Sequence, residues 1–192
     1  AYLALAAFEM VHRRRRYKDE GTAILMRYTL RLLTSQQFER CATVVAVLET
    51  MRKAAPQELG EKPFRIGLWV GGGLTPNYLD NDHDQNPGAR QMIERLRDAE
   101  EPDNPFLLRS CPRCGTRLVP RRYSSDAGHY GVVADASRFR FRCPEADCVF
   151  HEEIPASVVD EDLYRDPPTF LIGTIDKFAR MVWDPRSRAF LG

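Results

Sequence analysis

The sequence has 192 residues, of which 43% are hydrophobic and 29% charged, and its formal net charge is +1. This composition is typical of a folded protein of one domain, or of one domain with an insertion, and the balanced charge indicates no particular class of partner. No apolar run approaches the roughly 18–20 residues of a membrane span, and the opening apolar stretch precedes its basic run, the reverse of the order in a secretory signal.

Helical and strand patterns alternate along most of the chain. Apolar spacing predicts helices over residues 1–18 and 34–55, the second with a capping box of Thr34 and Gln37. Apolar runs predict strands over 22–29, 64–70 and 167–174, and shorter helices are expected over 89–101 and 175–183. This order indicates an α/β fold with a parallel sheet. The irregular residues 101–157 interrupt it, so we expect a body of residues 1–100 and 158–192 with an inserted subdomain.

Four of the five cysteines form two close pairs inside this irregular segment. Cys111 and Cys114 are spaced C-x2-C, and Cys143 and Cys148 are spaced C-x4-C. Four thiolates are the preferred ligand set of a structural zinc ion, which would supply folding energy to a segment poor in regular structure. The alternatives are two disulfides or unrelated buried thiols, and His151 is a possible substitute for one thiolate. A metal site favours a reducing compartment, so a cytoplasmic location is expected.

The same segment is rich in arginine, with aromatic residues interleaved. In "RFRFR", Arg138, Arg140 and Arg142 alternate with two phenylalanines, which predicts a strand with one arginine face and one apolar face. Guanidinium and aromatic groups suit phosphate contact and base stacking, so nucleic-acid binding is one interpretation. A solvated strand covering a small core is the other.

Four shorter patterns have simpler interpretations. "RRRR" (13–16) is either a nucleic-acid contact or the solvated end of a helix, and "VGGG" (70–73) lacks the Lys-Ser/Thr of a phosphate loop and is interpreted as a turn. "DNDHDQ" (80–85) begins like a calcium loop but has Gln85 at the glycine position. "VVDEDLY" (158–164) suggests an acidic Mg²⁺ motif at Asp160, although no phosphate loop accompanies it.

Three stretches together carry a family resemblance. "RYTLRLLTSQQ" (27–37) resembles motif Ia of superfamily-two helicases, and "PPTFLIGTIDKFARM" (167–181) resembles motif Ib. "AYLALAAF" (1–8) resembles the helix that follows the phosphate loop of the family. Their order, with a four-cysteine insertion between them, is most similar to the helicases of the DISARM phage-defence system.

The resemblance implies part of the first RecA-like lobe, an incomplete parallel sheet layer with a zinc-ribbon-like insertion. It implies that Thr29, Gln36, Thr174 and Lys177 contact the backbone phosphates of a nucleic acid, expected to be single-stranded DNA. The expected partners also include the second helicase lobe and other defence-system subunits, and no membrane. The family's phosphate loop is expected upstream of Ala1 and its DExH motif downstream, so ATP and Mg²⁺ belong to the complete parent. We expect no ATP hydrolysis from these 192 residues alone.

Two other classes of function remain open at this stage. The chain is alternatively a stand-alone zinc-ribbon module that binds nucleic acid or acts as an adaptor without a motor. A purely structural scaffold would have no affinity for nucleic acid. A GxGKT motif upstream and a DExH motif downstream in the parent would favour the motor.

Overall fold

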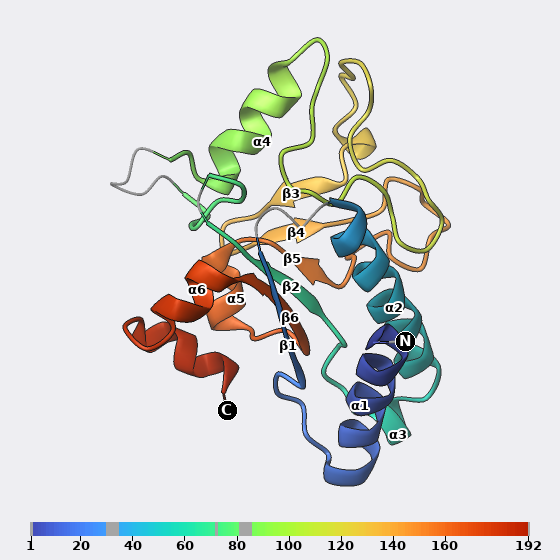
Figure 1. The fold of residues 1–192 in the computed structure, drawn as a ribbon. Helices are drawn as coiled ribbons and strands as arrows, with labels where there is room; N and C mark the ends of the chain where they lie inside the picture. The colour runs from blue at the N-terminus through green and yellow to red at the C-terminus, as the bar shows by residue number, and fades with distance from the viewer. Residues whose placement is uncertain (1, 30–34, 72, 81–85, 192) are drawn as a thin grey trace.

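The fold is built on a parallel sheet, which confirms the predicted α/β class. A computed structural model of the chain describes residues 2–29, 35–71, 73–80 and 86–191. Within them a four-stranded sheet has the order β1 (Ile24–Tyr28), β6 (Phe170–Thr174), β2 (Ile66–Trp69) and β5 (Ala156–Ser157), and all neighbours are parallel (Figure 1). The three predicted strands contain β1, β2 and β6, whereas the two-residue β5 was not predicted.

Burial along the strands follows their place in the sheet. All five residues of β6 and all four of β2 are buried, as expected for inner strands covered on both faces. The edge strand β1 exposes Leu25 and Arg27 in alternation with partly buried residues. The continuous apolar runs that predicted β2 and β6 therefore reflect their position inside the sheet.

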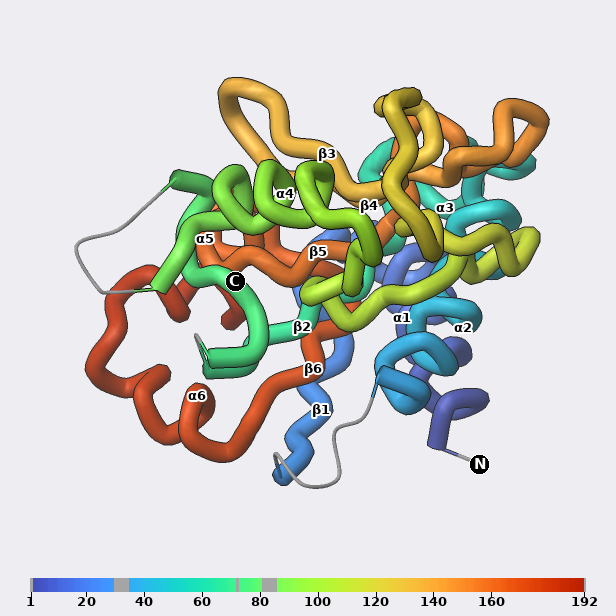
Figure 2. The backbone as a smooth tube through the Cα atoms, turned by 90° about the horizontal axis from the view of Figure 1, so that it is seen from above, coloured from blue at the N-terminus to red at the C-terminus, as the bar shows by residue number. Residues whose placement is uncertain are grey.

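Helices cover the two faces of the sheet separately (Figures 1 and 2). One face carries α1 (Tyr2–Tyr17), α2 (Ser35–Ala54) and α3 (Pro56–Leu59), and the other carries α5 (Asp160–Arg165), α6 (Ile175–Arg180) and the 3-10 turn η2 (Pro185–Phe190). Successive strand residues point to opposite faces. Leu68 and Ile172 accordingly join the main core, while Trp69 and Leu171 pack with Leu163 in a second, smaller core.

The middle segment packs on top of this body. It contains the 3-10 turn η1 (Ala127–His129) and an antiparallel pair, β3 (Val132–Ala134) and β4 (Phe139–Phe141), beside α4 (Ala89–Asp98). Phe139 and Phe141 are buried, and their rings lie 4.7 and 6.4 Å from that of Phe106. The main core runs without interruption from these rings to the helices on the sheet. The division into residues 1–100, 101–157 and 158–192 stays a prediction, and this shared core couples the stability of the parts.

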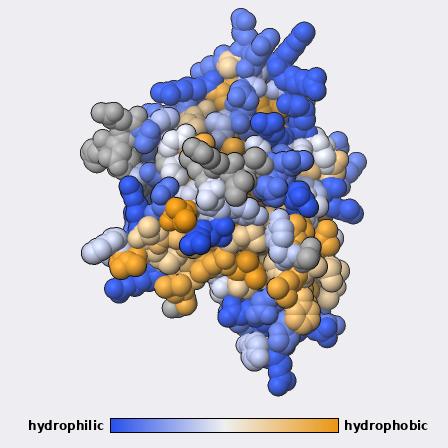
Figure 3. Space-filling model, viewed as in Figure 1, coloured by the Kyte–Doolittle hydropathy of each residue, from blue (hydrophilic) through white to orange (hydrophobic). Residues whose placement is uncertain are grey.

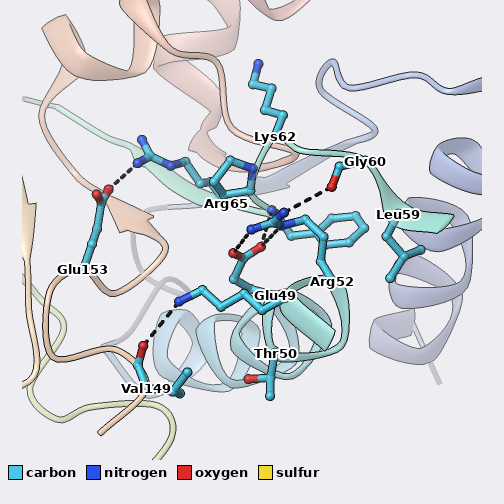
Figure 4. A network of polar contacts seen from close by, with 12 residues as sticks. Glu49, Thr50, Arg52, Leu59, Gly60, Lys62, Arg65, Val149 and Glu153 are labelled. Carbon is cyan, nitrogen blue, oxygen red and sulfur yellow. Dashed lines mark hydrogen bonds and ion pairs between the residues drawn. The ribbon is translucent and has the colours of Figure 1, made fainter. Parts of the chain in front are cut away.

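Buried arginines fasten the helices to the loop that leads into β2. Arg14 is 1% exposed, and its guanidinium donates to the carbonyl oxygens of Leu59 at 3.1 Å and Lys62 at 2.6 Å. Arg52 forms a two-bond pair with Glu49, each bond 2.8 Å, and also donates to the carbonyl oxygen of Gly60 (Figure 4). Neither interpretation of "RRRR" fits Arg14, because its charge lies inside the protein.

Some sequence predictions concern residues outside the described ranges. These are the capping residue Thr34, Gly72 of the glycine run, and residues 81–85 of the acidic loop. Within the described ranges, no helix has both the length and the apolar character needed to cross a bilayer.

Replacing Arg14 with methionine tests the buried contacts. Arg14→Met leaves the carbonyl oxygens of Leu59 and Lys62 buried without donors, so we expect the free energy of unfolding to fall by about 3 kcal/mol. The control is Arg15→Met, which removes an exposed pair with Glu58 and should cost less than about 1 kcal/mol. Urea denaturation measures both changes, and equal values would contradict the assigned role of Arg14.

Candidate metal centre and strand-contact residues

The four paired cysteines come together in space. Their Sγ atoms all lie within 4.8 Å of one another, with 3.8 Å between Cys111 and Cys148 and 3.4 Å between Cys114 and Cys143. All four are free thiols. One sulfur from each pair therefore faces one from the other, and the cluster can hold a single metal ion.

Tight turns present the sulfur atoms. In the first, the backbone N–H of Cys111 donates to the carbonyl oxygen of Thr116, and that of Gly115 donates to the carbonyl oxygen of Cys111. Gly115 has φ +77°, a value that glycine adopts without the strain of a Cβ atom. In the second, the N–H of Cys143 donates to the carbonyl oxygen of Phe150. Gly115 therefore allows the tight turn that follows the second cysteine.

His151 lies beside the cluster but is not part of it. Its Nδ1 is 3.0 Å from the carbonyl oxygen of Cys143 and 3.2 Å from that of Glu145. Carbonyl oxygens only accept hydrogen bonds, so this nitrogen acts as a donor. Cys41 lies in the main core, where burial raises its pKa to about 11. His151 was open in the sequence as a substitute for one thiolate, and its Nδ1 is instead hydrogen-bonded to backbone carbonyl oxygens.

Electrostatics within the cluster differ from one thiol to another. Burial raises the pKa of Cys111 to about 11 and raises that of Cys143 further. Burial also acts to raise the pKa of Cys114, but hydrogen bonds with Thr116 and the neighbouring thiols outweigh it and lower the value to about 7. Holding all four sulfurs as thiolates therefore needs a cation among them.

The two helicase-like stretches meet at one edge of the sheet. Tyr28 and Thr174 are register partners in β1 and β6, so Thr29, which follows directly, lies beside the end of β6. Thr29 and Gln36 are exposed, and Gln36 is in the first turn of α2. Thr174 is 2% exposed and precedes α6 without a side-chain capping bond. Carboxyl ends of parallel strands are where α/β proteins commonly bind ligands.

Lys177 points inward rather than toward solvent. Its ammonium group forms an ion pair with Asp160 and lies 3.4 Å from the side-chain oxygen of Asn77. The ammonium also lies 5.8 Å from the centre of the Trp69 ring. The ammonium group of Lys177 is thus already paired with the carboxylate of Asp160.

Asp160 is a residue whose role the sequence did not reveal. It is 4% exposed, and its Oδ1 has no hydrogen-bond partner among the described residues. Burial raises its pKa to about 6, although the charge of Lys177 acts in the opposite direction. The two residues are 17 positions apart, a spacing without any local signature.

Two cavities open beside this pair. One, of about 290 Å³, lies at the carboxyl ends of β2 and β6; the other, of about 170 Å³, lies toward α5 and η2, and both are lined by Lys177 and Arg180. The larger is also lined by Gly71, Gly73, Leu74, Thr174 and Asp176. The glycine run therefore borders a cavity at the sheet edge that also carries the helicase-like threonine.

The arginines of "RFRFR" are occupied within the protein. Arg138 pairs with Glu153 at 2.8 Å, and Arg140 pairs with Asp135 at 3.0 Å. Arg142 donates to the carbonyl oxygens of Tyr130 and Ala127. Since Phe139 and Phe141 are buried, the predicted two-faced strand is present. The use of its arginines for nucleic acid stays a prediction, and a phosphate would have to displace these partners.

The chain was compared with protein-family models and with known proteins. No family model matches it. A protein from Bacillus paralicheniformis, the DISARM protein DrmA, is 33% identical over 200 residues, an alignment that covers 100% of this chain. This chain resembles DrmA along its entire length. It spans 17% of the length of that protein, so the similarity concerns one part of DrmA.

The similarity to DrmA agrees with the resemblance seen in the separate motifs. It includes the helix at the start, both helicase-like stretches and the four cysteines within one alignment. The structure adds that the DrmA-like segment forms an α/β layer whose cysteines converge.

The titration of Asp160 makes stability depend on pH. Because its pKa is raised from 3.8 to about 6 in the folded state, the folded protein binds more protons than the unfolded chain between these values. Its contribution to stability is therefore lost as the pH rises through this window. We expect the stability of the wild type relative to Asp160→Asn to fall by roughly 2 kcal/mol between pH 4 and pH 6.5. Urea denaturation at both pH values tests this, and a constant difference would contradict the assignment.

Proposed function

We propose that this chain forms the strand-contact part of the first motor lobe of an ATP-dependent helicase or translocase in a phage-defence system. The observation that carries the proposal is the meeting of the two helicase-like stretches at one sheet edge, in a chain similar to DrmA throughout. Thr29 and Gln36 supply donors to phosphate oxygens from one stretch, and Thr174 and Lys177 supply them from the other. Such contacts carry no base preference, as a motor stepping along a strand requires.

The contact residues differ in how ready they are to bind. Thr29 and Gln36 are exposed, so they meet a strand without rearrangement. Lys177 is 14% exposed at its side chain and is held by Asp160, so a phosphate competes with this carboxylate. We therefore expect the first stretch to supply most of the contact in this chain.

The metal of the cysteine cluster is proposed to be zinc in a structural role. Four Zn–S bonds of about 2.3 Å in a tetrahedron place neighbouring sulfurs about 3.8 Å apart. The sulfur distances of 3.8 and 3.4 Å are close to that edge, and four thiolates leave no open coordination position for chemistry. The ion would fasten the two turns to each other.

ATP and Mg²⁺ are proposed to be bound by the longer parent. The 192 residues contain no Gly-Lys-Ser/Thr phosphate loop, and the carboxylate of Asp160 already pairs with a lysine.

A second helicase lobe and other defence-system subunits are the proposed protein partners. Figure 3 shows apolar side chains gathered on the lower part of one face, and Val182 and Trp183 are 83% and 84% exposed. Such surfaces suit contact with another folded part. The proposed location is the cytoplasm.

The stand-alone zinc-ribbon module is the alternative. It draws support from the exposed arginines near the first cysteine pair. Loss of nucleic-acid binding when only the sheet-edge residues change would favour the motor part, because an independent module would not need them. A scaffold without nucleic-acid affinity would show no binding at all.

Removing one cysteine tests the metal. Purified protein should contain about one equivalent of zinc, and Cys143→Ser should lose it because three thiolates hold the ion less tightly. Since the main core includes Cys143 and the helices over the sheet, this variant should also unfold at a lower urea concentration. Elemental analysis measures the metal. Cys41→Ser is the control and should keep its zinc; metal-free wild type would contradict the site.

Changing the exposed sheet-edge residues tests strand contact. The double variant Thr29→Ala, Gln36→Ala should bind a labelled single-stranded oligonucleotide more weakly, by roughly fivefold for each hydrogen bond of about 1 kcal/mol. Its salt dependence should not change, because neutral donors release no counterions. Fluorescence anisotropy across a salt series measures both. The control Thr43→Ala, Gln57→Ala removes the same groups from exposed positions on α2 and α3. Equal weakening in both variants would contradict the proposed contact.

A further inference from the structure

The arginines of the middle segment fall into two groups with different surroundings. The three on and beside β4 are held by carboxylates or carbonyl oxygens of the protein, as described above. The other five precede η1 and are exposed: Arg109, Arg113, Arg117, Arg121 and Arg122. None of their guanidinium groups has a hydrogen bond or ion pair with a described residue. We call residues 109–123 the arginine loop.

The arginine loop contains no acidic residue. Five positive charges within fifteen positions repel one another, so their clustering without ion-paired carboxylates is not favourable for folding itself. The loop is nevertheless held firmly. Leu118 and Val119 are 0% and 3% exposed, the N–H of Leu118 donates to the carbonyl oxygen of Arg109, and Cys111 and Cys114 belong to the metal cluster. Side chains on such a fixed backbone lose less freedom when they bind.

The loop adjoins the proposed strand-contact edge. The backbone N–H of Arg109 donates to the side chain of Glu39 at 3.0 Å. Glu39 lies three residues after Gln36, on the first turns of α2. A strand that meets Gln36 therefore passes next to the start of the arginine loop. Figure 3 shows hydrophilic side chains gathered over the loops on this upper side of the molecule.

We propose that the arginine loop, and not the "RFRFR" strand, is the part of the metal-binding segment that binds the phosphates of single-stranded nucleic acid. This inference rests on the proposed function and extends its contact surface from α2 onto the metal-held loop. The guanidinium fork matches phosphate oxygens with two parallel hydrogen bonds. Tyr123 is 58% exposed at the end of the loop, where its backbone N–H donates to the carbonyl oxygen of Glu100, and its ring offers a stacking surface for a base.

A different explanation would also place arginines near the cysteines. Four thiolates around a divalent ion have a formal charge of −2, and nearby arginines offset it. If this were their purpose, removing them would weaken metal retention rather than nucleic-acid binding. Metal content and binding therefore need to be measured on the same variants.

The test uses two triple variants with the same change in net charge. Arg113→Gln, Arg117→Gln, Arg121→Gln alters the arginine loop, and Arg95→Gln, Arg165→Gln, Arg188→Gln alters exposed arginines elsewhere. Anisotropy with a labelled single-stranded oligonucleotide is measured from low to moderate salt, and zinc by elemental analysis. The loop variant should bind at least tenfold more weakly at low salt, and its salt slope should fall by roughly 2, about 0.7 for each arginine–phosphate pair that is removed. The control should keep its slope, and both should keep their zinc.

Other outcomes separate this inference from the proposed function. If the wild type binds and the loop variant keeps its affinity and slope, the arginine loop does not bind the strand, while the proposed function survives. Equal weakening in both triple variants, or loss of zinc in the loop variant alone, would also overturn the inference. If the wild type shows no salt-dependent binding, the proposed function fails and this inference with it. Tyr123→Leu should weaken binding without changing the salt slope, since stacking releases no counterions. An unchanged affinity would show that the Tyr123 ring is not part of the binding surface.

Discussion

The convergence of four cysteine sulfurs is the constraint on which the upper half of the molecule depends. The facing pairs join residues 37 and 29 positions apart, across a segment whose regular structure is one short antiparallel pair. A metal ion held by these sulfurs would fix the arginine loop at one end and β4 at the other. Phe139 and Phe141 of β4 lie in the same core as the helices of the sheet, so the cysteine cluster and the α/β layer share one core. The residues after this segment form β5 and extend the sheet beside β2.

The parallel pairing of strands determines which residues come together at the end of the sheet. Since β1 and β6 run side by side in the same direction, two stretches about 145 residues apart end at the same edge. At that edge Lys177 and Asp160 form an ion pair, which holds the lysine away from solvent. A phosphate that contacts Lys177 must therefore compete with an existing ion pair, whereas Thr29 and Gln36 have no ion pair with any residue that the structure describes.

Local sequence patterns predicted the features of the structure that are determined by neighbouring residues. The inner strands were recognisable as apolar runs because both of their faces are covered, and the spacing of the two cysteine pairs indicated a single cluster. The sequence could not show that Arg14 is buried, because "RRRR" resembles any solvated helix end and its carbonyl partners lie 45 or more residues away. The pairing of Asp160 with Lys177 and the partners of Arg138, Arg140 and Arg142 likewise arise only from tertiary contacts. The strand β5 was missed because two residues carry no period.

The same lesson applies to the charge of the metal-binding segment. The high density of arginine in "RFRFR" suggested nucleic-acid binding. A guanidinium group can bind a phosphate readily only if it has no partner within the protein, and the arginines of this strand have partners that stabilise the fold. Arg138 and Arg65 share Glu153, and this network ties β4 to the entrance of β2. Figure 4 shows the pair of Arg65 with Glu153. Substitution of these arginines would lower nucleic-acid binding by destabilising the fold. Such a decrease alone would therefore not show that the arginines contact the nucleic acid. The unpartnered arginines of the loop have no comparable structural duty, and for that reason their substitution reports on binding itself.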